Sequence, residues 1–310
     1  MEMRKVFAAE LERIMAENKK VCFLDADLAK AGGTMKLREL FPDRAFDVGI
    51  AEANMASVAG GMSAYGMIPF ISTFAPFASR RISDQIAVSV SYARQNVKVV
   101  GLDPGISAEL NGGTHMSFED VGIYRSMPGI LIFEPVDTNQ LRQAMQQIVD
   151  YPGPVYMRLF RKETPDVFTD ASYKFDLLKA SKIRDGKDVS IFVSGLSTAD
   201  CVEAADILAK SNISANLINI HTIKPIDKKA IVQSAQKTGA VLTVENHNIY
   251  GGLYSAVAEV LSQECPTKCA CIGINDRHGQ VGKLKELKQA YGLTVEDIVA
   301  KAEQLVKAKK

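Results

Sequence analysis

One acidic residue stands where apolar residues dominate the sequence. Glu52 lies in the run GIAEANMASVAGGMSA, whose other members are mostly Gly, Ala, Met, Ile and Val. A carboxylate is costly to bury without a partner, but a buried carboxyl group can hold a proton or a short hydrogen bond. Glu52 is therefore either a helix-start glutamate that faces water or a buried acid with a specific partner. The near absence of a polar face in this run favours the buried acid.

Two phenylalanines and a histidine follow in segments that predict loops. Phe74 and Phe77 flank a proline in STFAPF, so they are either core residues or a flat aromatic wall for a ring-shaped ligand. His115 lies in NGGTH, where the glycines let the backbone approach a ligand closely. This histidine is either an ordinary surface residue or a group for proton transfer and hydrogen bonding to hydroxyls.

Charged residues lie where predicted strands end. Asp27 follows VCFLDA, and Asp103 closes VKVVGLD. The run VYMRLFRK ends in Arg158, Arg161 and Lys162, which form either a solvated rim or an anion clamp, since arginine suits phosphate. Ligands collect outside the carboxyl ends of strands in parallel sheets, so this edge of the molecule is the predicted site.

The elements that must position these residues alternate between strands and helices. A helix is expected over 3–18, near 51 and over 80–95, and strands over 21–27, 44–49, 67–72, 97–103, 130–135 and 155–160. The alternation resumes after 188, with strands over 189–195, 215–220, 240–246 and 269–275 and two closing helices. This order predicts an α/β fold of two parallel-sheet domains covered by helices. We divide the chain into domains 1–165 and 188–310, joined by a polar linker over 166–187.

Composition excludes several classes of protein. Apolar residues make up 47% of the 310 residues, and the formal net charge is +1, which gives no electrostatic reason to expect nucleic acid or an anionic membrane. No run reaches the ~18 apolar residues of a membrane span. The odd number of cysteines, five, suggests reduced thiols and a cytoplasmic protein.

Three of the cysteines lie close together. Cys265, Cys269 and Cys271 would need a fourth ligand to hold a metal, for which His278 is the candidate. Structural zinc sites usually show two ligand pairs, and CACIGI resembles a buried strand in which cysteine acts as a small hydrophobe. We therefore predict no metal site in this chain.

An ordered series of segments resembles the transketolase family of thiamin-diphosphate enzymes. The series is DADL, GIAEANM, STFAPF, NGGTHMSFEDVGIYRSMPG, RKETP, HTIKPID, VENHNIYGGLYSAVAEVL and YGLTVEDI. It covers nearly the whole chain but corresponds only to the pyrimidine-binding and C-terminal domains of that family.

The resemblance implies a role for each candidate residue. Glu52 would hydrogen-bond the aminopyrimidine ring of thiamin diphosphate and so promote proton loss from C2 of its thiazolium ring, with Phe74 and Phe77 as the aromatic wall. Asp27 would lie near the thiazolium ring. The remaining roles concern the substrate: His115 would bind it, as in the family's G-P-T-H motif, and Arg161 would bind the sugar phosphate.

Four positions depart from the family pattern. Asp103 stands where transketolases carry a histidine beside the reacting hydroxyls and is similar to the residue of deoxyxylulose-phosphate synthases. Asn111 occupies the position of an aspartate that recognises the acceptor sugar in the family. Arg80 replaces an aromatic residue, and Ala31 replaces a phosphate-binding serine. These differences leave the donor and acceptor sugars open and allow a specialised substrate. The resemblance assigns no catalytic residue to the C-terminal domain, which would serve dimer contacts.

The family's diphosphate-binding G-D-G motif is absent from the sequence. With its start at Met1, we interpret the chain as a natural subunit of a split enzyme. A separate N-terminal subunit would hold Mg²⁺ and the diphosphate, most simply in an α₂β₂ heterotetramer, and the pair would transfer a two-carbon ketol unit from a ketose phosphate to an aldose phosphate, as in the pentose phosphate pathway.

Other functions stay open. The β subunit of a 2-oxoacid dehydrogenase E1 shares the architecture and the glutamate, although the run T-H-x-x-x-E-D followed by R-S-M-P-G favours transketolase. An enzyme similar to deoxyxylulose-phosphate synthase is a second alternative. A non-catalytic regulatory or interaction subunit is a third, against which the retention of Glu52, both phenylalanines and His115 argues.

Overall fold

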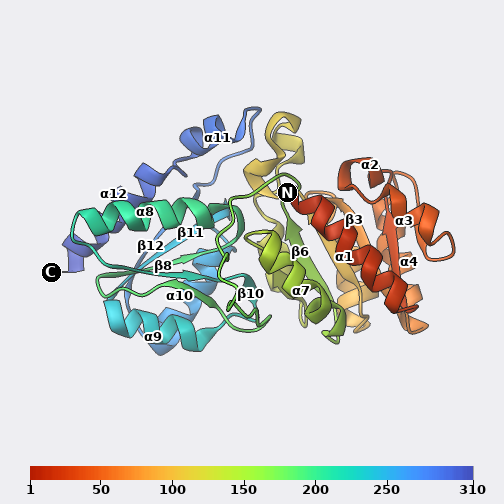
Figure 1. Cartoon of the computed structure of the whole chain (residues 1–310), viewed down its shortest axis with the longest axis horizontal. Coiled ribbons are helices and arrows are strands. Elements are labelled where there is room, and N and C mark those ends of the chain that lie inside the picture. The colour runs from red at the N-terminus through yellow and green to blue at the C-terminus, as the bar shows by residue number, and fades with distance from the viewer. Residues whose placement is uncertain (310) are drawn as a thin grey trace.

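The chain is built around two β-sheets, and the computed structural model describes residues 1–309 (Figure 1). The first sheet has the strand order β10-β5-β6-β4-β3-β1-β2, and the second has the order β12-β11-β8-β9-β7. The strands of the first sheet are β1 (Val21–Asp25), β2 (Ala45–Asp47), β3 (Ile68–Phe74), β4 (Lys98–Leu102), β5 (Leu131–Phe133), β6 (Val155–Leu159) and β10 (Thr222–Lys224). Those of the second are β7 (Ser181–Arg184), β8 (Val189–Val193), β9 (Ala215–Asn219), β11 (Ala240–Asn248) and β12 (Lys268–Ile274).

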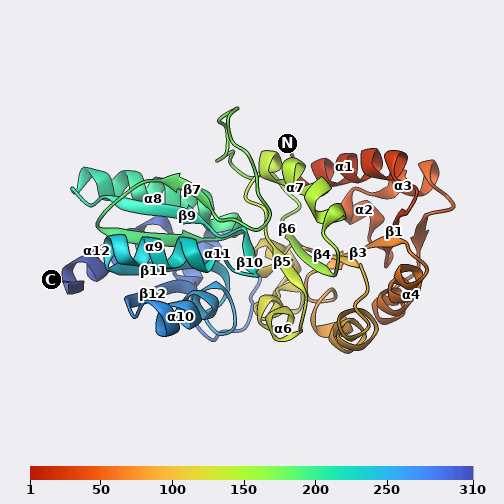
Figure 2. The same ribbon diagram turned by 90° about the horizontal axis from the view of Figure 1, so that it is seen from below.

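Helices cover both faces of the first sheet (Figure 2). Apolar side chains of α1 (Met3–Glu17) and α7 (Thr138–Asp150) pack on one face. The opposite face is covered by α4 (Glu52–Ala64), α6 (Asp120–Ser126) and the π-helical segment η2 (Ile86–Tyr92). Because β1, β3, β4 and β6 are buried on both sides, they are almost continuously apolar, as parallel strands require.

The second sheet is also covered on both faces. One face carries α8 (Thr198–Lys210), α11 (Leu284–Tyr291) and α12 (Val295–Lys309), and the other carries α9 (Lys228–Thr238) and α10 (Leu253–Glu264). The predicted α/β fold with two parallel-sheet domains is therefore confirmed. Each sheet is mixed, because β10 and β7 pair antiparallel to their neighbours β5 and β9.

Strand β10 belongs to the first sheet, although the chain forms it after all the other strands of that sheet and after β9 of the second sheet. It comes from the stretch that we assigned to the second domain, yet Thr222 pairs with Phe133 in the first sheet. The sequence pattern missed this strand because it has only three residues, too few for a periodicity.

The segment 166–187 is more structured than a linker. Its side chains Phe175 and Leu177 are 6% and 4% exposed and join the core beside α7. On α7, the Gln147 side chain donates to the Phe175 carbonyl at 2.9 Å and accepts from the Leu177 amide. Strand β7 then closes the segment at the edge of the second sheet. The segment resembled a linker because side chains of α7 satisfy its backbone, so it has no periodicity of its own.

The stretch expected to be one helix over 80–95 is divided. It consists of the 3₁₀ turn η1 (Arg80–Ile82), a short α5 (Ser83–Gln85) and η2. Its neighbour α4 approaches it closely, because a Cβ atom at Gly60 would lie 2.7 Å from the Ser89 carbonyl oxygen. The small residues around Glu52 thus permit close helix packing on this side of α4.

Candidate functional site

The predicted site lies at the carboxyl ends of the first sheet's strands, where the backbone is strained. Asp27 follows β1 with φ +58°, Asp103 follows β4 with φ +50°, and Glu109 has φ +47°. Non-glycine residues rarely adopt such angles, and they cluster at functional sites. Three of the six non-glycine residues with positive φ among residues 1–309 therefore lie at the edge that the sequence indicated.

Glu52 is a buried acid with an arginine as its partner. It occupies the first turn of α4 and is 3% exposed. Arg81, which is 44% exposed, donates from Nη1 to Glu52 Oε1 at 2.6 Å. The Arg81 guanidinium also lies 3.9 Å from the centroid of the Phe77 ring. The sequence favours a buried helix here, but α4 exposes Val58 (39%) and several small residues on its outer face.

Phe74, Phe77 and His115 form one aromatic cluster. The two phenylalanine rings are 6.2 Å apart, and the His115 ring lies 5.6 Å from Phe74 and 5.3 Å from Phe77, in edge-to-face arrangements. Thr114 Oγ1 lies 3.1 Å from His115 Nδ1 and can fix the ring's orientation. The structure thus brings His115 against two phenylalanines that lie about forty positions earlier in the sequence.

Arg161 joins this cluster to the end of β4. Its backbone amide donates to Asp103 Oδ1 at 3.0 Å, and its Nε donates to Asp103 Oδ2 at 2.5 Å. The guanidinium carbon is 4.9 Å from the centroid of the Phe74 ring. Burial raises the pKa of Asp103, and the charge and hydrogen bonds of Arg161 oppose this only in part. Asp103 and Arg161 therefore act as a unit, with one face of the guanidinium against the aromatic cluster.

Two predicted residues lie apart from the cluster. Asp27 is exposed, and its backbone amide donates to Asp47 Oδ1 at 3.0 Å. Asn111 is exposed at the end of the 3₁₀ segment η3 (Gly105–Asn111). Within residues 1–309, neither side chain hydrogen-bonds a member of the cluster, so their roles stay predictions.

Arg158, for which the sequence allows an anion clamp, is buried behind the site instead. It donates to Asp120 Oδ2 and to Glu134 Oε1, both at 2.8 Å, and to the carbonyl of Asn246 at 2.9 Å. Tyr156 adds a hydrogen bond from its hydroxyl to Asp120 Oδ2. Because Asn246 belongs to β11 of the second sheet, this hydrogen-bond network connects the first sheet to the second. The anion-clamp interpretation of Arg158 is wrong, because its charge is balanced inside the protein.

Two more ionisable groups lie beside this network. Burial raises the pKa of Glu245 to about 8, although the Leu253 and Tyr254 amides donate to its carboxylate and oppose that rise. Burial lowers the pKa of His247 to about 4, so this ring is neutral at physiological pH. Both groups therefore favour their uncharged forms in the interior.

A loop of the second domain reaches the His115 loop. A Cβ atom at Gly113 would lie 2.4 Å from the Gly279 carbonyl oxygen, so only glycine fits there. This contact favours glycine at the position where the family's G-P-T-H motif carries proline. Beside it lies a cavity of about 400 Å³ that both parts of the chain line, with Arg80, Arg277 and His278 among its residues.

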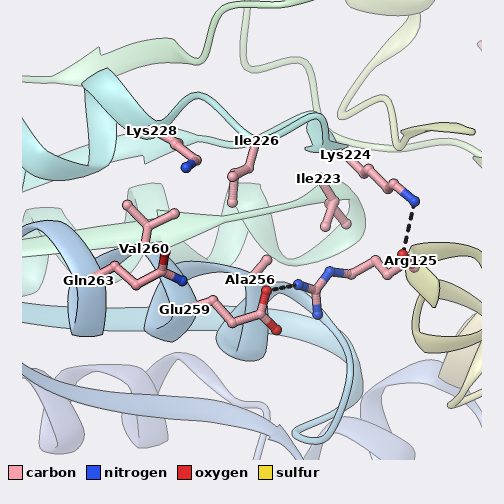
Figure 3. A pocket seen from close by; sticks show the side chains of 9 residues that line it. All are labelled: Arg125, Ile223, Lys224, Ile226, Lys228, Ala256, Glu259, Val260 and Gln263. Atoms are coloured by element: carbon pink, nitrogen blue, oxygen red, sulfur yellow. Dashed lines mark hydrogen bonds and ion pairs between the residues drawn. The ribbon is translucent and has the colours of Figure 1, made fainter. Parts of the chain in front are cut away.

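A separate cavity of about 290 Å³ lies between the end of α6 and α10 (Figure 3). Its cations are already engaged: Arg125 donates to Glu259 at 2.6 Å, and the Lys224 amine donates to the Arg125 carbonyl at 2.9 Å. None of its lining residues is among the predicted site residues.

The three neighbouring cysteines lie at the edge of the second sheet. Cys269 and Cys271 belong to β12, an edge strand that is only partly buried. Burial raises the pKa of the Cys269 thiol to about 12, which disfavours the thiolate that a metal requires. Among residues 1–309, no group of three or more His, Cys, Asp or Glu side chains is arranged to hold a metal ion. None of the helices in the same range combines the length and apolar character that crossing a membrane requires.

The geometry around Glu52 suits a flat ring that carries N–H groups. The Arg81 guanidinium is itself planar, and it lies on the Phe77 ring while it donates a hydrogen bond to Glu52. The sequence did not reveal Arg81, because its pairing with Glu52 depends on how η1 folds over α4. Its position four residues after Phe77 was the only available signal.

Comparison with known proteins identifies the family. The transketolase pyrimidine-binding domain family matches residues 1–166, and the transketolase C-terminal domain family matches residues 178–298. The chain belongs to the transketolase family.

Several relatives have about the same length as this chain. A 6-deoxy-6-sulfo-D-fructose transketolase subunit of Clostridium sp. (strain MSTE9) is 47% identical over 99% of this chain and 95% of its own length. An apulose-4-phosphate transketolase subunit of Phocaeicola vulgatus is 33% identical over 98% of this chain and 97% of its own length. The 1-deoxy-D-xylulose-5-phosphate synthase of Heliobacterium modesticaldum is 31% identical, but only 47% of its length is covered.

Solved structures agree with this assignment. A protein described as a split gene transketolase, inactive beta4 tetramer, has a TM-score of 0.90 and 38% identity, with 100% of this chain and 99% of that chain covered. The transketolase of Campylobacter jejuni, at 21% identity and a TM-score of 0.80, shows the same fold over 46% of its length.

Proposed function

We propose that this chain is the C-terminal subunit of a two-component transketolase that uses thiamin diphosphate. The observation that carries the proposal is the arrangement around Glu52. The planar guanidinium of Arg81 donates a hydrogen bond to the buried Glu52 carboxylate and stacks on the Phe77 ring. The same arrangement would hold the aminopyrimidine ring of the cofactor. When bound, thiamin diphosphate supplies the nucleophilic carbon and the electron sink that two-carbon transfer requires.

The residues of this chain would divide the remaining work. Glu52, whose carboxylate is buried, would hold or accept the proton at the ring nitrogen that it contacts. Phe74 and Phe77 form the wall that fixes the plane of the ring. His115, held against both phenylalanines, is placed to hydrogen-bond substrate hydroxyls, and the Asp103–Arg161 unit is placed to orient the sugar and its anionic end.

A separate subunit would supply the diphosphate and Mg²⁺ site. The similarity over full length to proteins named as transketolase subunits supports this division. An exposed apolar face offers the surface for assembly: Tyr65, Val88 and Tyr92 are 94%, 58% and 87% exposed around α4 and η2. Exposed apolar patches of this kind mark protein interfaces. Self-association is a further expectation, since the split-gene relative is described as a beta4 tetramer.

The substrate class is a ketose with a terminal anionic group, either phosphate or sulfonate. The 47% identity to a 6-deoxy-6-sulfo-D-fructose transketolase subunit favours a sulfonate, whereas the apulose-4-phosphate relative, at 33%, favours a phosphate. Both groups are tetrahedral oxyanions that an arginine can bind.

The test is reconstitution with the N-terminal partner, thiamin diphosphate and Mg²⁺. Ketol transfer to an aldose phosphate is assayed with xylulose 5-phosphate, fructose 6-phosphate and 6-deoxy-6-sulfofructose as donors. Transfer from at least one donor is expected, and the preferred donor identifies the anion. A reconstituted pair that binds the cofactor but transfers nothing from any donor would show that the proposed reaction is wrong.

A further inference from the structure

Arg81 contacts two of the three residues of the predicted pyrimidine site, Glu52 and Phe77. Its Nη1 donates to Glu52 Oε1 at 2.6 Å, and its guanidinium carbon lies 3.9 Å from the Phe77 ring centroid. Glu52 is 3% exposed, so almost no other group can reach its carboxylate while Arg81 is in place.

The guanidinium and an aminopyrimidine ring share the features that this site recognises. Both are flat, both present N–H groups in their plane, and both can stack on an aromatic ring. The two groups would compete for the same carboxylate oxygen and the same face of Phe77. A ring that stacks on the same face of Phe77 and bonds the Glu52 carboxylate would overlap the space that the guanidinium occupies, so binding of the ring would require the guanidinium to move.

The Arg81 side chain can also move away from Glu52. Its side chain is 44% exposed, and it extends from η1, a three-residue turn at the surface. The neighbouring Arg80 does not share its position, since it pairs with Glu119 at 2.8 Å. Displacement of Arg81 would therefore release one side chain into solvent without unfolding an element.

We propose that Arg81 is an internal stand-in for the cofactor's pyrimidine ring. It neutralises Glu52 in the chain without cofactor, and it must leave before thiamin diphosphate can bind. Arg81 thereby sets the affinity of the site for the cofactor, as a positioning residue for Glu52. This inference rests on the proposed function, because it requires that thiamin diphosphate occupies the Glu52 site.

The test is cofactor affinity, measured by isothermal titration calorimetry of the reconstituted enzyme with thiamin diphosphate and Mg²⁺. Arg81→Gln removes the competitor, so its Kd is expected to fall about fivefold, which corresponds to about 1 kcal/mol for the lost pair. Arg81→Lys keeps the charge but lacks the planar fork, so its Kd should lie between those of Arg81→Gln and the wild type.

The control is Arg13→Gln. Arg13 is also 44% exposed and also pairs with glutamate, but on α1, so the Kd of this variant should equal that of the wild type. Circular dichroism confirms that each variant is folded. A Kd for Arg81→Gln that is unchanged or higher would overturn the inference, because Arg81 would then be neutral or would help to hold the cofactor. Failure of the wild-type pair to bind thiamin diphosphate would instead refute the proposed function.

Discussion

Replacement of Arg158 by leucine tests the buried network that fastens the two parts of the chain. The Arg158 side chain is fully buried and bonds two carboxylates, Asp120 and Glu134, and the Asn246 carbonyl. Leucine removes all of these bonds while it fills part of the space. The two carboxylates are then left in the interior without a positive partner.

The size of the effect follows from these contacts. Removal of one partner from a buried ion pair costs about 3–5 kcal/mol, because the remaining charge is uncompensated. Here two acids lose their partner, but the Tyr156 hydroxyl still donates to Asp120, and Asp120 can take up a proton. We therefore expect the free energy of unfolding to fall by about 4 kcal/mol at pH 8, a large part of the ~5–15 kcal/mol typical of a domain.

The loss should depend on pH in a defined direction. In the wild type, burial alone would raise the pKa of Asp120, but the charge and hydrogen bonds of Arg158 outweigh burial and hold it below the usual value. That stability is present above the unfolded pKa and is lost only at low pH. In Arg158→Leu the raised pKa of Asp120 makes the folded state take up a proton, so its stability rises as the pH falls. The difference between the two proteins should shrink from pH 8 to pH 5.

Urea unfolding followed by circular dichroism measures this difference at each pH. Arg13→Leu, an exposed arginine on α1, should change the free energy of unfolding by less than about 0.5 kcal/mol. A loss below about 1 kcal/mol for Arg158→Leu at pH 8, or a difference that grows as the pH falls, would refute this account of the network.

Two further changes test other contacts. Gly113→Ala would place a Cβ atom 2.4 Å from the Gly279 carbonyl oxygen, so it should move the His115 loop. We expect KM for the donor sugar to rise about fivefold in steady-state kinetics. An unchanged KM would show that this contact does not position the loop. Phe175→Ala should lower the free energy of unfolding, measured by urea denaturation, by about 3–5 kcal/mol, because Phe175 is 6% exposed in the core beside α7. A loss below about 1 kcal/mol would show that the segment 166–187 is only loosely attached.

Much of the fold could be predicted from the sequence because the strands are buried on both faces. The strands predicted over 21–27, 97–103 and 155–160 coincide with β1, β4 and β6 apart from their ends, and each of these observed strands is apolar except for one charged residue. The position of Glu52 at the start of a helix was equally clear from its small apolar neighbours. The segment 166–187 and β10 were missed because their stability comes from contacts far along the chain, which leave no local pattern.

The site was only partly accessible to sequence reasoning. Phe74, Phe77 and His115 were selected by type and neighbours, and the structure brings them together. The sequence did not indicate a role for Arg81, and it allowed a wrong one, an anion clamp, for Arg158. Both errors have the same cause, because the partner of an arginine side chain is set by the tertiary structure. Arg158 and Arg161 lie three residues apart at the end of one strand, yet one is buried between acids and the other faces the aromatic cluster.

The most direct test of the central claim is the rate at which the C2 proton of thiamin diphosphate exchanges with deuterium, followed by NMR. Our account predicts fast exchange with the reconstituted wild-type pair. With this chain alone, or with a pair that carries Glu52→Gln, exchange should be slower by about 10²–10⁴-fold. Exchange as fast with Glu52→Gln as with the wild type would contradict the role of Glu52 on which the proposed function rests.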